Sequence, residues 1–283
     1  MNKKNARLLG VLSLLLGGDG SLYAFSFAGK TGESGSLPVE IDAASGITCE
    51  KKGQVCTARG NVIVTHGDTT LTCDVLKAFF HMDNQDRPQE LIRLEAHGNV
   101  RIKAKEGAKR AAADVGVFHV KTSHAVLTGR DLFLALGETN VRARDSLEYF
   151  EQKKLAVAKG EASVEKKGKL LKADQLDAYF KESHQKDTLD HVDATGNVFA
   201  STQDDVAQGD RGVYTDADEV VILTGNVRIT KRGQGRMMGE RGRYDMKNGF
   251  AALLPAENGG QNPSASPKTR VKVLLIPRQE KSA

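Results

Sequence analysis

The sequence predicts an all-β protein built as a stack of antiparallel strand–turn–strand repeats. Apolar and polar residues alternate in many short segments, which is the pattern of half-buried strands. Helical periodicity is nearly absent. The third observation is self-similarity, because one kind of segment recurs along most of the chain. These segments begin at a glycine: GNVIV at Gly60, GNVRI at Gly98, GETNVRA at Gly137, GEASV at Gly160, GNVFA at Gly196 and GNVRI at Gly225.

The alternation within a segment assigns one face of each strand to the interior. In GNVIVTH, Val62 and Val64 share a face while Ile63 points the other way. A later copy repeats this arrangement with Val227 and Ile229. The Gly-Asn pair supplies the positive φ angles that tight turns need, so we expect each copy to begin at a turn.

A second strand follows in most copies, with an acidic residue and then an aromatic residue. Single acidic residues, one per copy, lack the density of calcium-binding repeats, so we expect them to fix turns through local hydrogen bonds. From Phe118 onward the aromatics are expected to lie in register, where they would pack the core or line an apolar groove. The pairs are Asp74 with Phe79, Asp114 with Phe118, Asp145 with Tyr149, Asp174 with Tyr179, Asp210 with Tyr214, and Glu240 with Tyr244.

A longer period of about 100 residues overlies the short one. Gly60 recurs as Gly160, and the VLTG of residues 126–129 recurs as ILTG. We therefore predict two tandem units, residues 38–158 and 159–254. No Pro- or Gly-rich linker separates them, which favours one continuous stack.

The two ends of the chain carry other signals. Residues 1–28 have the layout of a secretory signal peptide, with a positive start, the apolar run LLGVLSLLL and small residues at AFSFA. Cleavage after Ala28 fits best, with Ala24 as the alternative. Residues 255–269 read as a flexible linker, and residues 270–277 as a terminal edge strand.

The cysteines allow a disulfide in an exported protein. A turn at Lys52-Gly53 places Cys49 directly opposite Cys56 on paired strands. That geometry permits a bond, but paired strands also hold cysteines opposed without bonding. Cys73 is left unpaired, and the spacings of zinc sites are absent.

Charge and motifs exclude several classes of function. The formal net charge is +5, and it becomes +3 once the leader is removed, because the leader holds three basic residues and one acidic residue. That balance does not indicate a nucleic-acid protein, and the basic run GNVRITKRGQGRMMGERGRY is one variable copy of the repeat. Catalytic signatures such as HExxH, GxSxG and the Walker lysine motif are absent. A polysaccharide hydrolase would need paired inward carboxylates, which single acidic residues do not supply. We expect no enzyme activity, no metal and no cofactor.

Three stretches carry a resemblance to a known family: GQVCTARGNVIVTHGDTTLTCDVL, HAVLTGRDL and RVKVLLIPRQ. They resemble the OstA-type repeat of the LptA-like family of periplasmic lipopolysaccharide-transport proteins of Gram-negative bacteria. The resemblance covers roughly residues 38–277. It departs from the family in one respect, because the repeat unit is duplicated here.

The resemblance implies a twisted antiparallel β-jellyroll, open at both ends, whose apolar interior holds the acyl chains of lipid A while the sugars stay outside. It implies that copies stack head to tail by strand addition. It also implies a bridge between an LptC-like inner-membrane component and an LptD-like outer-membrane component, which supports outer-membrane biogenesis. No nucleic acid is expected as a partner.

Inward alternating residues are the candidate lipid-binding trough. Two alternatives stay open: a closed core without ligand at any one of these positions, and an LptC-like scaffold that binds only protein partners. The trough candidates are Val39, Ile41, Val62, Val64, Val100, Ile102, Phe118, Val198, Val227 and Ile229. The candidate edge-strand residues for assembly are Val39, Ile41, Val271, Val273 and Leu275.

Overall fold

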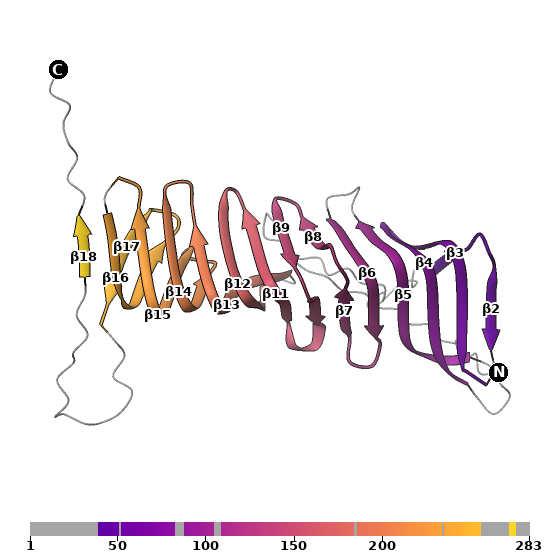
Figure 1. Cartoon of the computed structure of the whole chain (residues 1–283). Coiled ribbons are helices and arrows are strands. Elements are labelled where there is room, and N and C mark those ends of the chain that lie inside the picture. Colours follow the sequence, from indigo (N-terminus) through magenta and orange to yellow (C-terminus); the bar gives the residue numbers. More distant parts are fainter. Residues whose placement is uncertain are drawn as a thin grey trace, which may run out of the picture. The chain divides into compact units, whose positions relative to one another are not determined.

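The computed structural model describes residues 39–50, 52–82, 88–104, 109–183, 186–233, 235–255 and 272–275. Most of these residues lie in antiparallel strands, so the predicted all-β fold class is confirmed (Figure 1). The described helical element is one turn of 3-10 helix, η2 (Glu151–Lys153). Within these ranges, no helix has the length and apolar character needed to span a membrane.

The chain forms two compact units. The first holds the described residues up to Lys159 together with Phe180–Thr188, and the second holds Gly160–Tyr179 and the described residues from Leu189 onward. The first unit contains β1 (Val39–Asp42), β2 (Ile47–Glu50), β3 (Val55–His66), β4 (Thr69–Met82), β5 (Pro88–Ala104), β6 (Lys109–His119), β7 (His124–Thr128), β8 (Leu132–Leu136), β9 (Thr139–Ala143) and β10 (Ser146–Phe150). Three strands contribute residues to both units: β11 (Leu155–Lys166), β12 (Lys169–Ser183) and β13 (Lys186–Ser201). The second unit also contains β14 (Asp205–Thr215), β15 (Val220–Lys231), β16 (Gly235–Asp245), β17 (Phe250–Leu254) and β18 (Lys272–Leu275).

Long strands in the first unit pair with their neighbours along the chain, from β3 through β6. In some places two short strands each pair with one half of the same long strand. Thus β2 pairs with the first half of β3 and β1 with its second half. In the same way β7 and β8 share β6. A short pair therefore takes the place of one long strand.

The second unit repeats this plan at its C-terminal edge. Strands β13 to β16 pair in order, and β17 and β18 then share the two halves of β16. β18 lies within the predicted terminal strand 270–277. The predicted signal peptide, most of the linker and Val271 lie outside the described residues, and the predicted boundaries of the tandem units stay a prediction.

The Gly-Asn pairs do not begin strands, so that prediction was wrong. They lie in the middle of long strands, as Gly60 and Asn61 do in β3, with φ angles of 80° and 45°. The pairing register with β4 shifts at this point, between Arg59 and Val62. Two residues of one strand then oppose a single residue of the next, which is a β-bulge. The bulge bends the strand without ending it.

The repeated acidic residues lie on the strands next to these bulges. Asn99 donates a hydrogen bond of 2.9 Å from its Nδ2 to Oδ2 of Asp74. Asn226 makes the same contact with Asp210, at 2.8 Å, and Asp174 also accepts from the asparagine of a bulge. The prediction that these acids fix turns through local hydrogen bonds was therefore wrong, because the bonds run between neighbouring strands and hold the asparagines of the bulges.

The repeated aromatic residues lie in register only in part. Phe118, Tyr149 and Tyr244 are interior residues, at most 1% exposed. Tyr179 is only partly buried, and its neighbour Phe180 takes the interior place. At a bulge the acidic residue and its successor both point outward, so interior positions lie two, four and six residues after the acid. Tyr179 is the fifth residue after its acid and therefore falls on the other face.

Cys49 and Cys56 lie directly opposite each other in the hairpin of β2 and β3, and the structure joins them by a disulfide. The neighbouring pair Glu50 and Val55 has the register that the predicted turn requires. Cys73 is a buried free thiol.

Candidate functional site

The two units each have an apolar interior formed by alternate residues of the strands. The predicted trough residues other than those of β1 are at most 6% exposed. Their sequence neighbours point outward, since Ile63 is 42% exposed and Arg228 is also exposed. Interior trough residues are Val62, Val64, Val100, Ile102 and Phe118 in the first unit, and Val198, Val227 and Ile229 in the second.

Ile41 does not share this burial, because it is 39% exposed. It pairs with Val64, so it lies on the inward face. In the described pairings β1 has a neighbour on one side only, which leaves the side chain open. The side chain of Val39 lies outside the described part of the structure, as do those of Val273 and Leu275.

The interior extends further along each strand than the sequence interpretation placed it. Ala58, Ala96 and Leu223 lie two residues before a bulge glycine and are at most 4% exposed. If a Gly-Asn pair begins a strand, the residues before the pair belong to another element, and the sequence prediction therefore omits them. The alternation itself continues through the glycine, and that signal would have found them.

One end of the interior is polar. In the first unit a line of paired residues crosses the sheet where β3 ends and β4, β6 and β9 begin. Its polar members follow the inward alternation and are at most 8% exposed. The second unit has inward polar residues at the equivalent strand ends, and we call the whole set the polar rim. It consists of His66, Thr69, Lys109, Thr139, Lys169, Asp205 and Lys231.

Opposite ends of the strands meet in the second unit. β15 has 12 residues, a length of about 40 Å if it were straight. Lys231 at its last position nevertheless donates to the carbonyl oxygen of Gly249. Gly249 lies in the turn after Asp245, the residue that pairs with Val220 at the start of β15. The two ends of β15 therefore lie closer together than in a straight strand, and the bulge between Thr224 and Val227 is a place where the strand can bend.

Two further contacts make the same connection within the second unit. Lys169 at the start of β12 donates to the carboxylate of Glu219, which lies in the turn before β15. The hydroxyls of Thr202 and Tyr244 lie 3.0 Å apart. We call the line along which these strand ends meet the seam.

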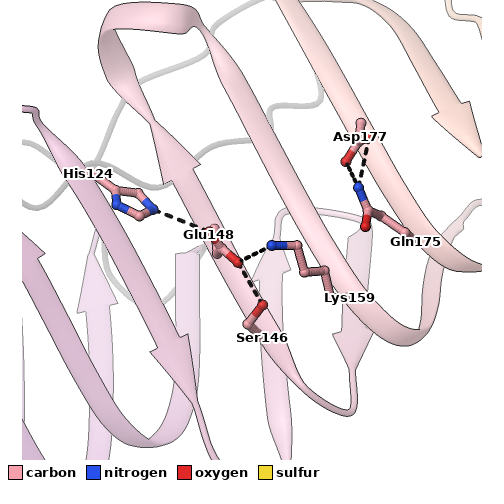
Figure 2. Close-up of polar contacts among 6 residues, drawn as sticks. All are labelled: His124, Ser146, Glu148, Lys159, Gln175 and Asp177. Atoms are coloured by element: carbon pink, nitrogen blue, oxygen red, sulfur yellow. Dashed lines mark hydrogen bonds and ion pairs between the residues drawn. The ribbon is translucent and has the colours of Figure 1, made fainter.

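The outer face of the first unit carries a polar cluster around Glu148 (Figure 2). Glu148 accepts hydrogen bonds from Lys159 Nζ at 2.8 Å and Ser146 Oγ at 2.9 Å, and His124 Nε2 lies 3.3 Å away. Burial acts to raise the pKa of Glu148, but these hydrogen bonds outweigh it and the pKa is lowered. The carboxylate thus remains charged and is tied to its own strand, β10, and to the two strands that flank it, β7 and β11, which is a structural role.

His119 lies beside this cluster and is expected to make stability depend on pH. Burial, then His124 and Arg93, lower the pKa of His119 from its model-compound value of 6.5. The unfolded chain therefore binds this proton more readily than the folded protein, and stability falls as the pH drops through 6.5. His119→Gln should lose less stability than the wild type between pH 7.5 and pH 5.5, measured as urea midpoints. An equal loss in both proteins would contradict this assignment.

The described residues offer little reactive chemistry. Burial, followed by the charge of Asp74, raises the pKa of Cys73 to about 11, so the thiol stays protonated. Among the described residues, no group of three or more His, Cys, Asp or Glu side chains is placed to hold a metal ion. What the geometry does offer is an apolar interior in each unit, with polar residues at one end.

A sequence model of the LptA and LptD N-terminal domain family of LPS transport proteins matches the chain twice, at residues 40–145 and 140–250. The two matches follow one another along the chain, as expected of a duplicated repeat. No curated protein matches the chain significantly. One similar solved structure is LptH of Pseudomonas aeruginosa, the LptA-homologous periplasmic component of the lipopolysaccharide transport device. It is 20% identical, covers 49% of this chain and 95% of its own, and has a TM-score of 0.41.

Proposed function

Because the chain belongs to the LptA and LptD N-terminal domain family of LPS transport proteins, we propose that it binds lipopolysaccharide through its acyl chains. The observation that carries this proposal is the apolar inward row that recurs in both units. A methylene moved from water into such an interior gains about 0.8 kcal/mol. A chain of about ten methylenes would gain roughly 8 kcal/mol before the costs of association, so no covalent or metal site is needed.

We place the protein in the periplasm, as part of the bridge between the inner and outer membranes. The proposed partners are an LptC-like component, an LptD-like component and further copies of this chain. Strands β1 and β2 at one edge, and β17 and β18 at the other, are short strands of the kind that pair with an added strand. Each repeat unit, 38–158 and 159–254, would hold part of the lipid path.

The interior side chains pack closely against one another, since the candidate trough residues beyond β1 are at most 6% exposed. Acyl chains therefore enter only if the two halves of the bent strands move apart. The polar rim suits an amphipathic ligand, because acyl chains prefer the apolar row while a sugar headgroup needs hydrogen-bond partners.

Photo-crosslinking tests the proposal directly. A photoreactive residue at Val64 or Ile102 should capture lipopolysaccharide in the periplasm, because both side chains point inward. The same group at Ile63, one residue away on the outer face, should not. Equal capture from the two faces would refute an interior lipid site. Absence of lipid from every position, together with absence of copurified lipid by mass spectrometry, would favour a scaffold that binds proteins only.

A further inference from the structure

Two lysines of the polar rim in the second unit carry an inference that rests on the proposed function. Lys169 and Lys231 are two residues from Leu171 and Ile229, on the same faces of their strands as these interior residues. Each lysine reaches across the seam to an oxygen acceptor from the opposite strand end. Lys169 donates to Glu219, and Lys231 donates to the carbonyl of Gly249.

The positions of these lysines differ from those of ordinary surface lysines. Their side chains are 31% and 23% exposed, and each donates a hydrogen bond to an acceptor across the seam. Lys172, by contrast, lies on the outward face of β12 and is exposed. The ammonium groups of Lys169 and Lys231 therefore lie where an amphipathic ligand would pass from its apolar part to its headgroup.

We propose that Lys169 and Lys231 form a binding site for the phosphate groups of a phosphorylated glycolipid. The phosphate oxygens would take the places of the two acceptors that these lysines contact, the Glu219 carboxylate and the Gly249 carbonyl. When lipid parts the seam, each ammonium exchanges one oxygen acceptor for another. An ammonium is a compact charge that binds phosphate well, and a hydrogen bond to a charged group is stronger than a neutral one.

The acidic residues beside the two lysines do not oppose this exchange. Glu219 is already 35% exposed, so it meets water when Lys169 leaves. Asp205 is a buried acid whose Oδ2 lies 3.7 Å from Lys231 Nζ, and it pairs with Lys231 between β14 and β15. This carboxylate can stay with Lys231 while the ammonium turns another of its protons towards the ligand.

Two substitutions that break the same ion pair distinguish a phosphate-binding site from an ion pair that only holds the seam closed. Glu219→Gln and Lys169→Gln both remove the attraction across the seam, but only the first keeps the ammonium. The probes are diphosphoryl lipid A and the same lipid A after its phosphates are removed. Binding is measured by fluorescence titration of each full-length variant, with circular dichroism to show that each is folded.

For diphosphoryl lipid A we expect Lys169→Gln to bind about tenfold more weakly than wild type, and Glu219→Gln to bind as tightly or more tightly. Lys231→Gln should resemble Lys169→Gln. For the dephosphorylated lipid, Lys169→Gln and Glu219→Gln should behave alike. The matched control Lys172→Gln, on the outer face of the same strand, should leave both affinities unchanged.

Equal affinities of Lys169→Gln and Glu219→Gln for diphosphoryl lipid A would overturn the phosphate site. So would an equal loss in Lys172→Gln, which would indicate attraction by net charge alone. If the wild type binds both lipids, either result leaves the proposed lipid function standing. If the wild type binds neither lipid, the proposed function fails and the phosphate site fails with it.

Discussion

Gly196→Ala is expected to lower the free energy of unfolding by about 2–5 kcal/mol. Gly196 lies at the bulge of β13 with a φ angle of +77°, where a side chain costs about 1–2 kcal/mol. A Cβ at this position would also overlap Oδ2 of Asp174 and lie 2.9 Å from its Cγ. Forcing that carboxylate away adds about 1–3 kcal/mol. Urea unfolding monitored by circular dichroism measures the loss.

Gly168 supplies a matched control within the same unit. Its φ angle of +75° is nearly the same, but nothing lies within 4 Å of the position of its Cβ. Gly168→Ala should therefore show only the backbone cost, about 1–2 kcal/mol. Equal losses at the two glycines would mean that overlap with Asp174 contributes nothing to the loss of stability in Gly196→Ala. Removing the carboxylate by Asp174→Ala should recover part of the loss caused by Gly196→Ala.

Ile102→Ala is the second substitution with a large expected effect. Ile102 is 1% exposed in the interior of the first unit, so the change removes packed methyl and methylene groups and leaves a cavity. Such substitutions cost about 2–5 kcal/mol. Ile63→Ala changes the same residue type on the outer face, where the side chain is 42% exposed. There the expected loss is within about 1 kcal/mol.

The comparison of these two isoleucines also tests the inward and outward assignment without any lipid. A similar loss at both positions in urea unfolding would contradict the assignment of faces. A large loss at Ile102 alone would place the interior where the alternation predicts it. If the interior binds acyl chains, the Ile102→Ala variant should recover stability when lipid is added, because a ligand that binds only the folded protein stabilises it.

The fold class and the faces of the strands could be predicted because both are local. A period of two is a property of neighbouring residues, so Val62 and Val64 could be assigned to the interior from their spacing alone. The register of Cys49 and Cys56 was equally local, since a short turn fixes it. The tandem repeat needed only a comparison of the chain with itself.

The bulges were misread because turns and bulges use the same residues. A Gly-Asn pair with positive φ can reverse a chain in a hairpin or bend a strand that continues. A bulge differs from a turn in having a paired strand on either side. At Gly98-Asn99 these neighbouring strands place Asp74 and Asp114 opposite the bulge. Those acids are visible in the sequence, but their place beside the glycine depends on pairing.

The sequence by itself determined that this protein is a duplicated, all-β member of a lipopolysaccharide-transport family with an alternating apolar face. Only the tertiary structure decided that the strands with a Gly-Asn pair continue through it and that opposite strand ends meet in the second unit. Lys169 and Glu219 are 50 residues apart and belong to no common motif. Their contact depends on how several paired strands curve together. A sequence pattern confined to one segment does not encode that curvature.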